Sequence, residues 1–133
     1  MENEIIEVDY AYVSKFRRLC EAEGVPLSET KNTRWFRTAG HEAFAGLLQF
    51  SEKKVRLKAL FVQKEWRGFG FASKLVDYRI GIAKQHGFDV ETIVKDVPNR
   101  THPYIRRGFR VAGKLPNGNL RMLLVNKFDQ FEG

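Results

Sequence analysis

The sequence is poor in the residues that form disulfides and metal sites. Cys20 is the one cysteine among 133 residues, so no disulfide can form within the chain. The three histidines, His41, His86 and His102, lie far apart and do not have the spacing of a zinc-binding motif. These shortages exclude a disulfide-stabilised scaffold and argue against a metal centre, so we expect no metal ligands.

Long apolar runs are also absent. No stretch approaches the roughly 20 apolar residues that a transmembrane helix requires. The first residues, Met1-Glu2-Asn3-Glu4, have neither the basic nor the apolar region of a secretory signal peptide. The sequence has no internal repeat, low-complexity tract or linker. We therefore expect a cytoplasmic protein without a membrane partner, folded as one domain over residues 1–133.

The composition is that of a globular protein with a basic surplus. Hydrophobic residues make up 43% of the chain and charged residues 29%, which is typical of folded domains and not of disordered chains. The 23 Lys and Arg against 16 Asp and Glu leave a net charge of +7. A basic surface attracts anions, so the charge favours phosphates, nucleotides or nucleic acid as partners.

The amino-terminal half predicts one helix followed by three strands. Apolar residues at three-to-four spacing predict an amphipathic helix from Asn3 to Glu23. Residues 24–33 are polar and rich in turn formers, which indicates a loop. The runs that follow are joined by short turns and predict an antiparallel meander; they are Arg34–Ala39, Ala43–Ser51 and Lys54–Val62.

The second half predicts a strand-helix-strand crossover and a closing hairpin. A glycine turn after Val62 leads to a helix from about Phe71 to His86, then to a strand over Phe88–Val94. Gly87 is suited to end the helix in a left-handed conformation. This connection is long enough for a right-handed crossover between parallel strands. The hairpin is predicted from two further runs, Phe109–Gly113 and Leu120–Phe128.

The strongest chemical signal is the segment Arg67-Gly-Phe-Gly-Phe-Ala72, between the end of an apolar strand and the start of a helix. Glycines let the backbone approach a ligand, and the unpaired amides of a first helical turn favour a phosphate or pyrophosphate. The segment is not a Walker loop, because Phe71 follows Gly70 where that motif has lysine. A dinucleotide fingerprint is disfavoured, because Ser73 replaces its third glycine and the chain offers one crossover unit.

The spacing of Arg67, Gly70 and Ala72 fits the acetyl-CoA loop pattern Gln/Arg-x-x-Gly-x-Gly/Ala, and here the sequence resembles the GNAT superfamily of N-acetyltransferases. Leu60-Phe-Val62 resembles the family's splayed fourth strand, and Tyr104-Ile-Arg-Arg-Gly-Phe109 its tyrosine-x-x-x-glycine-phenylalanine element. About 75 residues follow the order of the family's motifs. The resemblance implies an α/β (α+β) fold, with a mixed, mostly antiparallel sheet of about six to seven strands flanked by helices.

The resemblance also implies acetyl-CoA as cofactor and a set of residues that hold it. In the family a bulge in the fourth strand frees backbone N–H groups for pantetheine and the thioester oxygen, which maps onto Leu60, Phe61 and Val62. Tyr104 matches the family's general acid, which returns a proton to the CoA sulfur. The pyrophosphate would lie on the backbone of the glycine turn and on one hydroxyl, at Arg67, Gly68, Phe69, Gly70, Phe71, Ala72 and Ser73.

Two features depart from the family pattern. Arg56 stands where several protein-acetylating relatives have a glutamate base, and Lys58 lies beyond it. Because a lysine-type amine with a pKa of about 10.4 is almost wholly protonated at pH 7, some deprotonation route is needed. Asn99 lies five residues before Tyr104, where the family's common spacing is seven. The candidates for a base acting through water are Glu91, Asp96 and His102.

We therefore expect an N-acetyltransferase that moves an acetyl group from acetyl-CoA to an amine of a protein or small molecule by direct attack on the thioester. The missing strand carboxylate and the Asn99 spacing support a second hypothesis, a binding module that keeps the fold without catalysis. The charge of +7 supports a third, an acetyltransferase of aminoacyl-tRNA with nucleic-acid contacts. Arg56 and Lys58 favour an acidic acceptor if they face its groove. The oligomeric state stays open between monomer and homodimer.

Overall fold

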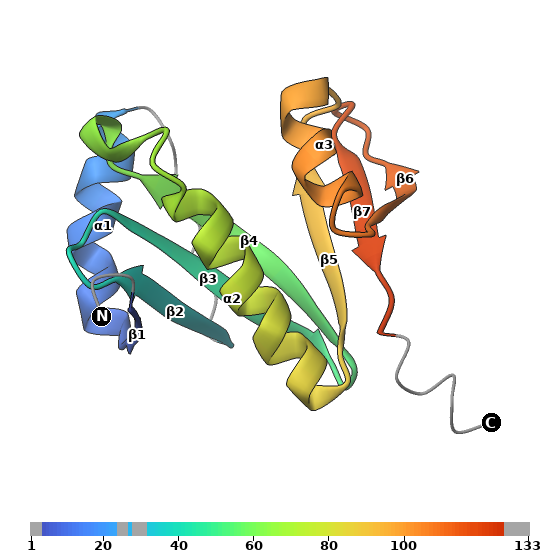
Figure 1. Cartoon of the computed structure of the whole chain (residues 1–133), viewed down its shortest axis with the longest axis horizontal. Helices are drawn as coiled ribbons and strands as arrows, with labels where there is room; N and C mark the ends of the chain where they lie inside the picture. Colours follow the sequence, from blue (N-terminus) through green and yellow to red (C-terminus); the bar gives the residue numbers. More distant parts are fainter. Residues whose placement is uncertain (1–3, 24–26, 28–31, 127–133) are drawn as a thin grey trace.

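The computed structural model describes residues 4–23, 27 and 32–126. Its strands form one seven-stranded sheet in the order β1-β2-β3-β4-β5-β7-β6 (Figure 1). None of the described helices is long and apolar enough to cross a membrane. In chain order the elements are β1 (Ile5–Val8), α1 (Tyr10–Ala22), β2 (Thr33–Thr38), β3 (Ala43–Ser51), β4 (Lys54–Val62), the short 3₁₀ helix η1 (Lys64–Trp66), α2 (Phe71–His86), β5 (Asp89–Val94), α3 (Pro98–Ile105), β6 (Arg110–Lys114) and β7 (Leu120–Leu124).

The start of the chain differs from the predicted helix Asn3–Glu23. Ile5–Val8 form the edge strand β1, which pairs antiparallel with β2, and α1 begins only at Tyr10. Asp9 marks the boundary, because its carboxylate accepts a hydrogen bond from the Tyr12 amide and caps the helix. The helix prediction was wrong before Asp9 because periodicity cannot assign a short β-branched run, whereas pairing with β2 can.

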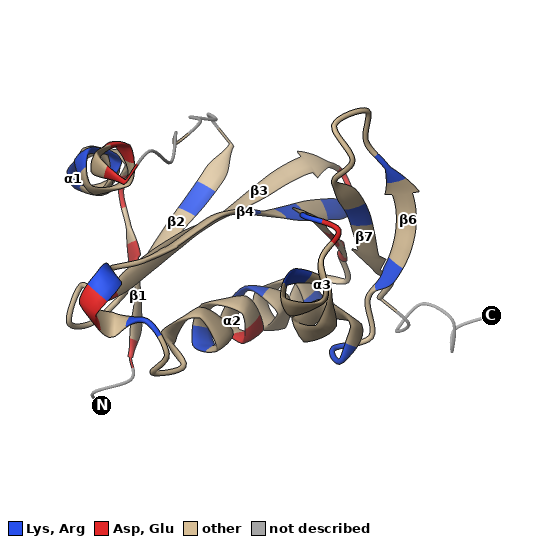
Figure 2. Ribbon diagram, turned by 90° about the horizontal axis from the view of Figure 1, so that it is seen from above, with Lys and Arg blue, Asp and Glu red and all other residues tan. Residues whose placement is uncertain are grey.

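The predicted meander of β2, β3 and β4 is confirmed, and helices cover both of its faces (Figure 2). Thr33, predicted as loop, opens β2, while most of the loop 24–33 lies outside the described residues. Side chains alternate along the strands, so that neighbours such as Trp35 and Phe36 enter different cores. The α2 core includes Phe36, Leu47, Val55, Leu57, Leu75, Val76, Ile80 and Ala83. The α1 core consists of Val13, Phe16, Cys20, Trp35, Phe44 and Phe61.

The predicted crossover is also confirmed, and its two parallel strands diverge. β4 pairs with β5 from Lys54–Arg56 to Asp89–Glu91 and no further along the described strands. α2 spans the predicted range, ends at Gly87 with φ of +74°, and leads into β5 one residue after the predicted start. In Figure 1 the two strands separate beyond their paired end, with α2 on one side and α3 on the other.

The carboxyl-terminal hairpin completes the sheet with its second strand on the inside. β7 pairs with β5 and β6 pairs with β7, so the second strand of the hairpin joins the sheet and the first strand forms its edge. α3 has only eight residues, with Pro98 in its first turn and Pro103 within it. The predicted strand end Phe128 lies outside the described residues. The structure confirms the predicted α/β fold class.

Candidate functional site

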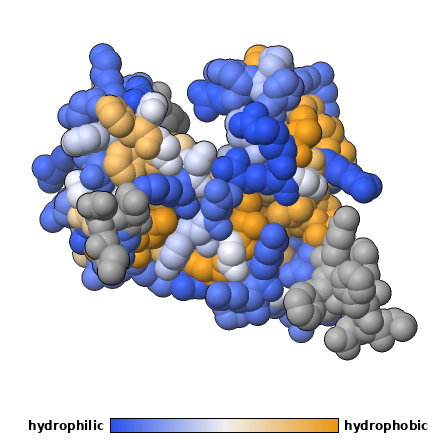
Figure 3. Space-filling model, in the orientation of Figure 1, coloured by the Kyte–Doolittle hydropathy of each residue, from blue (hydrophilic) through white to orange (hydrophobic). Residues whose placement is uncertain are grey.

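The divergence of β4 and β5 opens a cavity of about 320 Å³ between the two halves of the sheet. One wall is β4 over residues 57–60, backed by Arg79 of α2. The other is β5 and its continuation over residues 92–95, together with Arg100 and Tyr104 of α3 and Asn119 of the hairpin turn. Figure 3 shows the molecule hollowed between these two lobes. The divided sheet therefore offers a concave site whose walls come from five elements of the fold.

A bulge shapes the β4 wall of the cavity. Leu60 pairs with Ala45 but Lys58 pairs with Gly46, so Ala59 is an extra residue in β4. Ala59 has a φ of +42°, a left-handed conformation that is uncommon for a residue with a side chain. Strained backbone of this kind gathers at functional sites, because surrounding contacts must hold it there. The bulge redirects β4 at the point where β5 has already left it.

Of the three β4 residues predicted to bind the cofactor, Leu60 lies on this wall, while Phe61 and Val62 follow it at the end of the strand. Leu60 is exposed and lines the cavity. The side chain of Phe61 is buried in the α1 core, and that of Val62 packs against the α2 core. Any contribution of Phe61 and Val62 to ligand binding must therefore come from their backbone.

The predicted glycine turn leads from η1 to the amino terminus of α2. Gly68 and Gly70 have φ values of +87° and +89°, which favour glycine at both positions. A Cβ atom added to either would meet no atom within 4 Å, so the space above the turn is open. Gly70 is the N-cap of α2, no side chain caps the helix, and its first turn contains no acidic residue. The amides at the start of α2 therefore suit an anionic ligand.

The Arg67 side chain forms hydrogen bonds within the protein, and Phe69 of the turn faces outward, whereas Phe71 packs against the α2 core. The Arg67 guanidinium donates to the Val62 carbonyl at 2.9 Å and to a Glu23 carboxylate oxygen at 2.5 Å, which ties the turn to the end of β4 and of α1. Phe69 is 67% exposed, and its ring contacts that of Trp66 at a centroid distance of 5.9 Å. The Arg67 side chain thus fixes the shape of the turn.

Tyr104 lies in the cavity wall formed by α3. Its ring packs edge-on against Phe109, with ring centroids 5.4 Å apart, and its position places it across the cavity from β4. The side chains around it are strongly basic: the cationic lining residues are Lys58, Arg79, Lys95 and Arg100, and no Asp or Glu lines the cavity among the described residues. A positive potential of this kind favours negative charge that develops in the cavity.

The three candidate bases do not line the cavity. Glu91 is 6% exposed and lies between two arginines, with carboxylate oxygens 2.6 Å from Arg56 Nε and 3.4 Å from Arg121 Nη1. This contact also turns Arg56 toward Glu91. Asp96 faces Lys114 at 3.8 Å, and His102 is exposed on α3. None of the three therefore faces the cavity, and the described residues that line it include no Asp, Glu or His.

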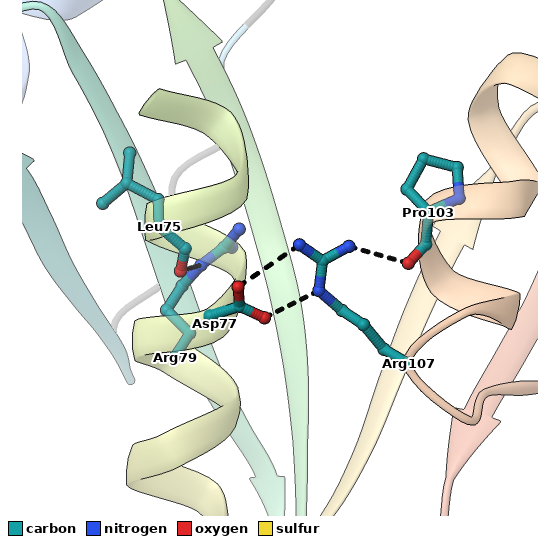
Figure 4. A network of polar contacts seen from close by, with 5 residues as sticks. All are labelled: Leu75, Asp77, Arg79, Pro103 and Arg107. Carbon is teal, nitrogen blue, oxygen red and sulfur yellow. Dashed lines mark hydrogen bonds and ion pairs between the residues drawn. The ribbon is translucent and has the colours of Figure 1, made fainter. Parts of the chain in front are cut away.

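Sequence reasoning missed three charged residues of the cavity, Arg79, Lys95 and Arg100, and of these Arg79 is the buried one. Arg79 is 1% exposed and lies in α2 between the core positions Leu75 and Ala83. Its Nε donates to the Leu75 carbonyl at 3.0 Å (Figure 4). Burial lowers the pKa of Arg79 to about 10, so it remains charged at neutral pH. The signal was present in the sequence, because an arginine interrupts the core-facing stripe of a helix.

The divided sheet, the bulged strand and the glycine turn together define the GNAT fold. The family model described as an acetyltransferase (GNAT) domain matches residues 8–119, and the chain belongs to this family. No curated protein sequence matches the chain. Within the described ranges 4–23, 27 and 32–126, no cluster of histidine, cysteine and acidic residues could hold a metal ion.

Solved structures of several acetyltransferases share the fold at low sequence identity. The ribosomal-protein-S18-alanine N-acetyltransferase from Escherichia coli is 16% identical, with a TM-score of 0.77 over 93% of this chain and 94% of that one. A dodecameric spermidine N-acetyltransferase from Vibrio cholerae is 14% identical, with a TM-score of 0.77 over 95% of each chain. An aminoglycoside 6'-N-acetyltransferase complexed with coenzyme A is 15% identical, with a TM-score of 0.67 over 91% of this chain and 96% of that one.

Proposed function

We propose that this protein is a cytoplasmic, acetyl-CoA-dependent N-acetyltransferase in which residues 1–133 form one catalytic domain. The observation that carries the proposal is the open glycine turn that follows the bulged strand β4, whose residues 57–60 line a cavity together with Tyr104. The coenzyme A complex of the aminoglycoside enzyme with the same fold supports this cofactor. The acceptor is an amine of a protein or a small molecule, and the protein acts as a monomer or homodimer.

The turn and the bulged strand would bind different parts of acetyl-CoA. The amides from Arg67 to Ser73 would bind the pyrophosphate, because the positive φ values of Gly68 and Gly70 leave the space above the turn open. The backbone of β4 from Leu60 to Val62 would bind the pantetheine, because β5 has diverged and no longer pairs with it there. The acetyl thioester supplies an activated carbonyl carbon for the transfer.

The residues of the cavity suit the two negative charges that acetyl transfer creates, one on the carbonyl oxygen and one on the leaving sulfur. Backbone N–H groups of β4 would stabilise the oxyanion that forms when the amine attacks the carbonyl carbon. The Tyr104 hydroxyl would return a proton to the sulfur that leaves. The cationic lining disfavours a protonated amine, so an acceptor that loses its proton to water is favoured over one that needs a carboxylate base.

The thermal midpoint of unfolding with and without acetyl-CoA tests the proposal. A ligand at 100 times its dissociation constant stabilises the native state by about 2.7 kcal/mol, which raises the midpoint by about 10 °C in a chain of this size. We expect this shift with acetyl-CoA and not with ATP or NAD at equal concentration. The absence of any shift at saturating acetyl-CoA would contradict the proposed cofactor.

The lack of a carboxylate among the described residues that line the cavity favours one other function, a binding module that holds the cofactor without transferring its acetyl group. Release of free CoA thiol in the presence of a panel of amines, peptides and aminoacyl-tRNA separates the two functions. Turnover with any acceptor refutes the binding module. If aminoacyl-tRNA is the acceptor, the rate must fall steeply with salt, whereas a small amine predicts a flat salt profile.

A further inference from the structure

The Arg79 side chain of α2 forms hydrogen bonds to both strands of the bulge, β3 and β4. Its Nη1 donates to the Gly46 carbonyl of β3 at 2.9 Å and to the Lys58 carbonyl of β4 at 3.3 Å. Gly46 and Lys58 are the pair directly beside the extra residue Ala59. One side chain of α2 therefore holds both strands at the register shift, where the ladder of strand hydrogen bonds is interrupted.

The charge of Arg79 has no anionic partner in the described part of the chain. Its hydrogen bonds go to three carbonyl oxygens, and no carboxylate there forms an ion pair with it. A buried cation without a counter-charge is costly, and burial accordingly lowers the pKa of Arg79 to about 10. Arg79 also lines the cavity opposite Tyr104. The guanidinium thus satisfies three carbonyl oxygens, two of them at the bulge, and at the same time places a positive charge beside the cavity.

We propose that Arg79 is a positioning residue of the transfer site, which fixes the β4 bulge and keeps a positive charge behind the place where the CoA thiolate forms. This inference rests on the proposed function. In the transfer, the amine nitrogen forms a bond to the carbonyl carbon and loses a proton to water. The C–S bond breaks, and its electron pair remains on sulfur as a thiolate. Tyr104 donates a proton to that sulfur and is reprotonated by solvent.

The predicted consequence is that the protein prefers the thiolate form of CoA. An alkyl thiol such as that of cysteine has a pKa of about 8.5, and a tenfold preference for the thiolate lowers that pKa by one unit. The groups that face the same cavity are Lys58 of β4, Lys95 after β5, and Arg100 and Tyr104 of α3. Lys95 and Arg100 are exposed and screened by water, whereas Arg79 is not.

The test compares the pH dependence of binding for CoA and for desulfo-CoA, which lacks the sulfur. Calorimetry is performed between pH 6.5 and 9.5 on the full chain with Tyr104→Phe, so that the tyrosine does not titrate. We expect the affinity for CoA, relative to that for desulfo-CoA, to rise about tenfold between pH 6.5 and 9.5. Because desulfo-CoA has no thiol, its profile shows the effect of all other groups that titrate in this range. Parallel profiles for the two ligands would overturn the inference. Failure of both to bind would refute the proposed cofactor instead.

Variants of Arg79 separate the effect of its positive charge from the effect of its hydrogen bonds at the β4 bulge. In the Tyr104→Phe protein, Arg79→Met should abolish the tenfold difference and Arg79→Lys should retain most of it. In the protein with Tyr104 intact, Arg79→Lys should lose turnover, because lysine cannot hold both carbonyls. Lys84→Met, which removes another basic residue of α2, should leave the difference unchanged. A tenfold difference that persists in folded Arg79→Met would overturn the inference. If Arg79→Met does not fold, Lys58→Met in the Tyr104→Phe protein decides the result, because loss of the tenfold difference there would assign it to Lys58 and overturn the inference.

Discussion

Arg107 Nε lies 2.7 Å from Asp77 Oδ1, an ion pair that ties the end of α3 to the middle of α2 (Figure 4). A second guanidinium nitrogen of Arg107 donates to the Pro103 carbonyl at 2.7 Å, which holds the side chain in this direction. The pair connects the two lobes on the α2 side of the sheet, where β4 and β5 have diverged. It is thus a direct link across the divided part of the fold.

A double-mutant cycle should detect this link. We expect Asp77→Ala and Arg107→Ala to be coupled by about 0.5–1 kcal/mol in urea unfolding, and no more, because Asp77 is 65% exposed. Arg107→Ala alone should cost more than Asp77→Ala, since it also removes the bond to Pro103. The coupling should fall in 1 M salt. A coupling energy near zero at low salt would show that the pair does not join the lobes energetically.

Substitutions at the two ends of α2 should separate an effect on stability from an effect on cofactor binding. Gly70 and Gly87 lie at opposite ends of α2, both have positive φ, and an added Cβ atom meets nothing within 4 Å at either. Gly70→Glu and Gly87→Glu should therefore each destabilise the fold by about 1 kcal/mol. Only Gly70→Glu should abolish acetyl-CoA binding, because it places a negative charge in the proposed pyrophosphate site. Equal acetyl-CoA affinity in both variants, measured by calorimetry, would refute that site.

Tyr104→Phe should lower turnover without weakening cofactor binding. The phenylalanine ring retains the packing against Phe109, and only the hydroxyl is lost. Loss of a general acid typically costs a factor of about 10²–10⁴ in rate, while the dissociation constant of acetyl-CoA should change by less than about twofold. Tyr78→Phe is the matched control, because Tyr78 is an exposed tyrosine of α2 outside the cavity. An unchanged kcat in Tyr104→Phe would remove Tyr104 from the mechanism.

The parts of the fold that could be predicted from the sequence are those with local signals. The stripe of apolar residues and the flanking Gly70 and Gly87 define α2, and its observed bounds are the predicted ones. Short turns between strand-like runs rich in apolar residues define the meander, because they leave antiparallel pairing as the simplest connection. The glycine turn could be predicted for the same reason, since glycine is the residue that readily adopts the positive φ found at Gly68 and Gly70.

The parts that could not be predicted depend on pairing between distant segments. β1 is a strand because β2 lies beside it, and Ala59 is bulged because β3 and β4 pair out of register by one residue. Glu91 was a candidate base until β5 placed it beside Arg56 of β4, which holds its carboxylate. No local pattern encodes these neighbours, so the acceptor side of the site was the least predictable.

Cys20 should be almost unreactive in the folded protein. Its thiol is 1% exposed in the α1 core, and burial, then the nearby charges of Glu23 and Glu21, raise its pKa. Because Cys20 is the sole cysteine, a chromogenic disulfide reagent reports on it alone. We expect labelling at least about 100-fold slower than in 6 M guanidinium, with a rate that follows the unfolding of α1 from Phe44 and Phe61. Rapid labelling without denaturant would contradict the burial of this helix.

The pairing of β1 with β2 should weaken in acid through one carboxylate. Arg34 donates to both Glu7 oxygens, at 2.7 and 3.0 Å, and these hydrogen bonds hold the pKa of Glu7 below its ordinary value of 4.5. A carboxyl whose pKa is lower in the folded state stabilises that state above the unfolded pKa. The contribution is lost as pH falls through the folded pKa. Glu7→Gln should therefore be less stable than wild type at pH 7, and the difference should vanish once the pH has fallen below the folded-state pKa of Glu7.

The size of this difference is limited by solvent, because both side chains are 47% exposed. We expect at most about 1 kcal/mol at pH 7 from urea unfolding at a series of pH values. Arg34→Met is the matched variant: it should lose the same pH dependence and additional stability, because the Arg34 guanidinium also packs 5.3 Å from the Phe36 ring centre. Adding Glu7→Gln to Arg34→Met should then change little at any pH. A pH dependence of Glu7→Gln identical to that of wild type would show that other carboxylates control acid unfolding.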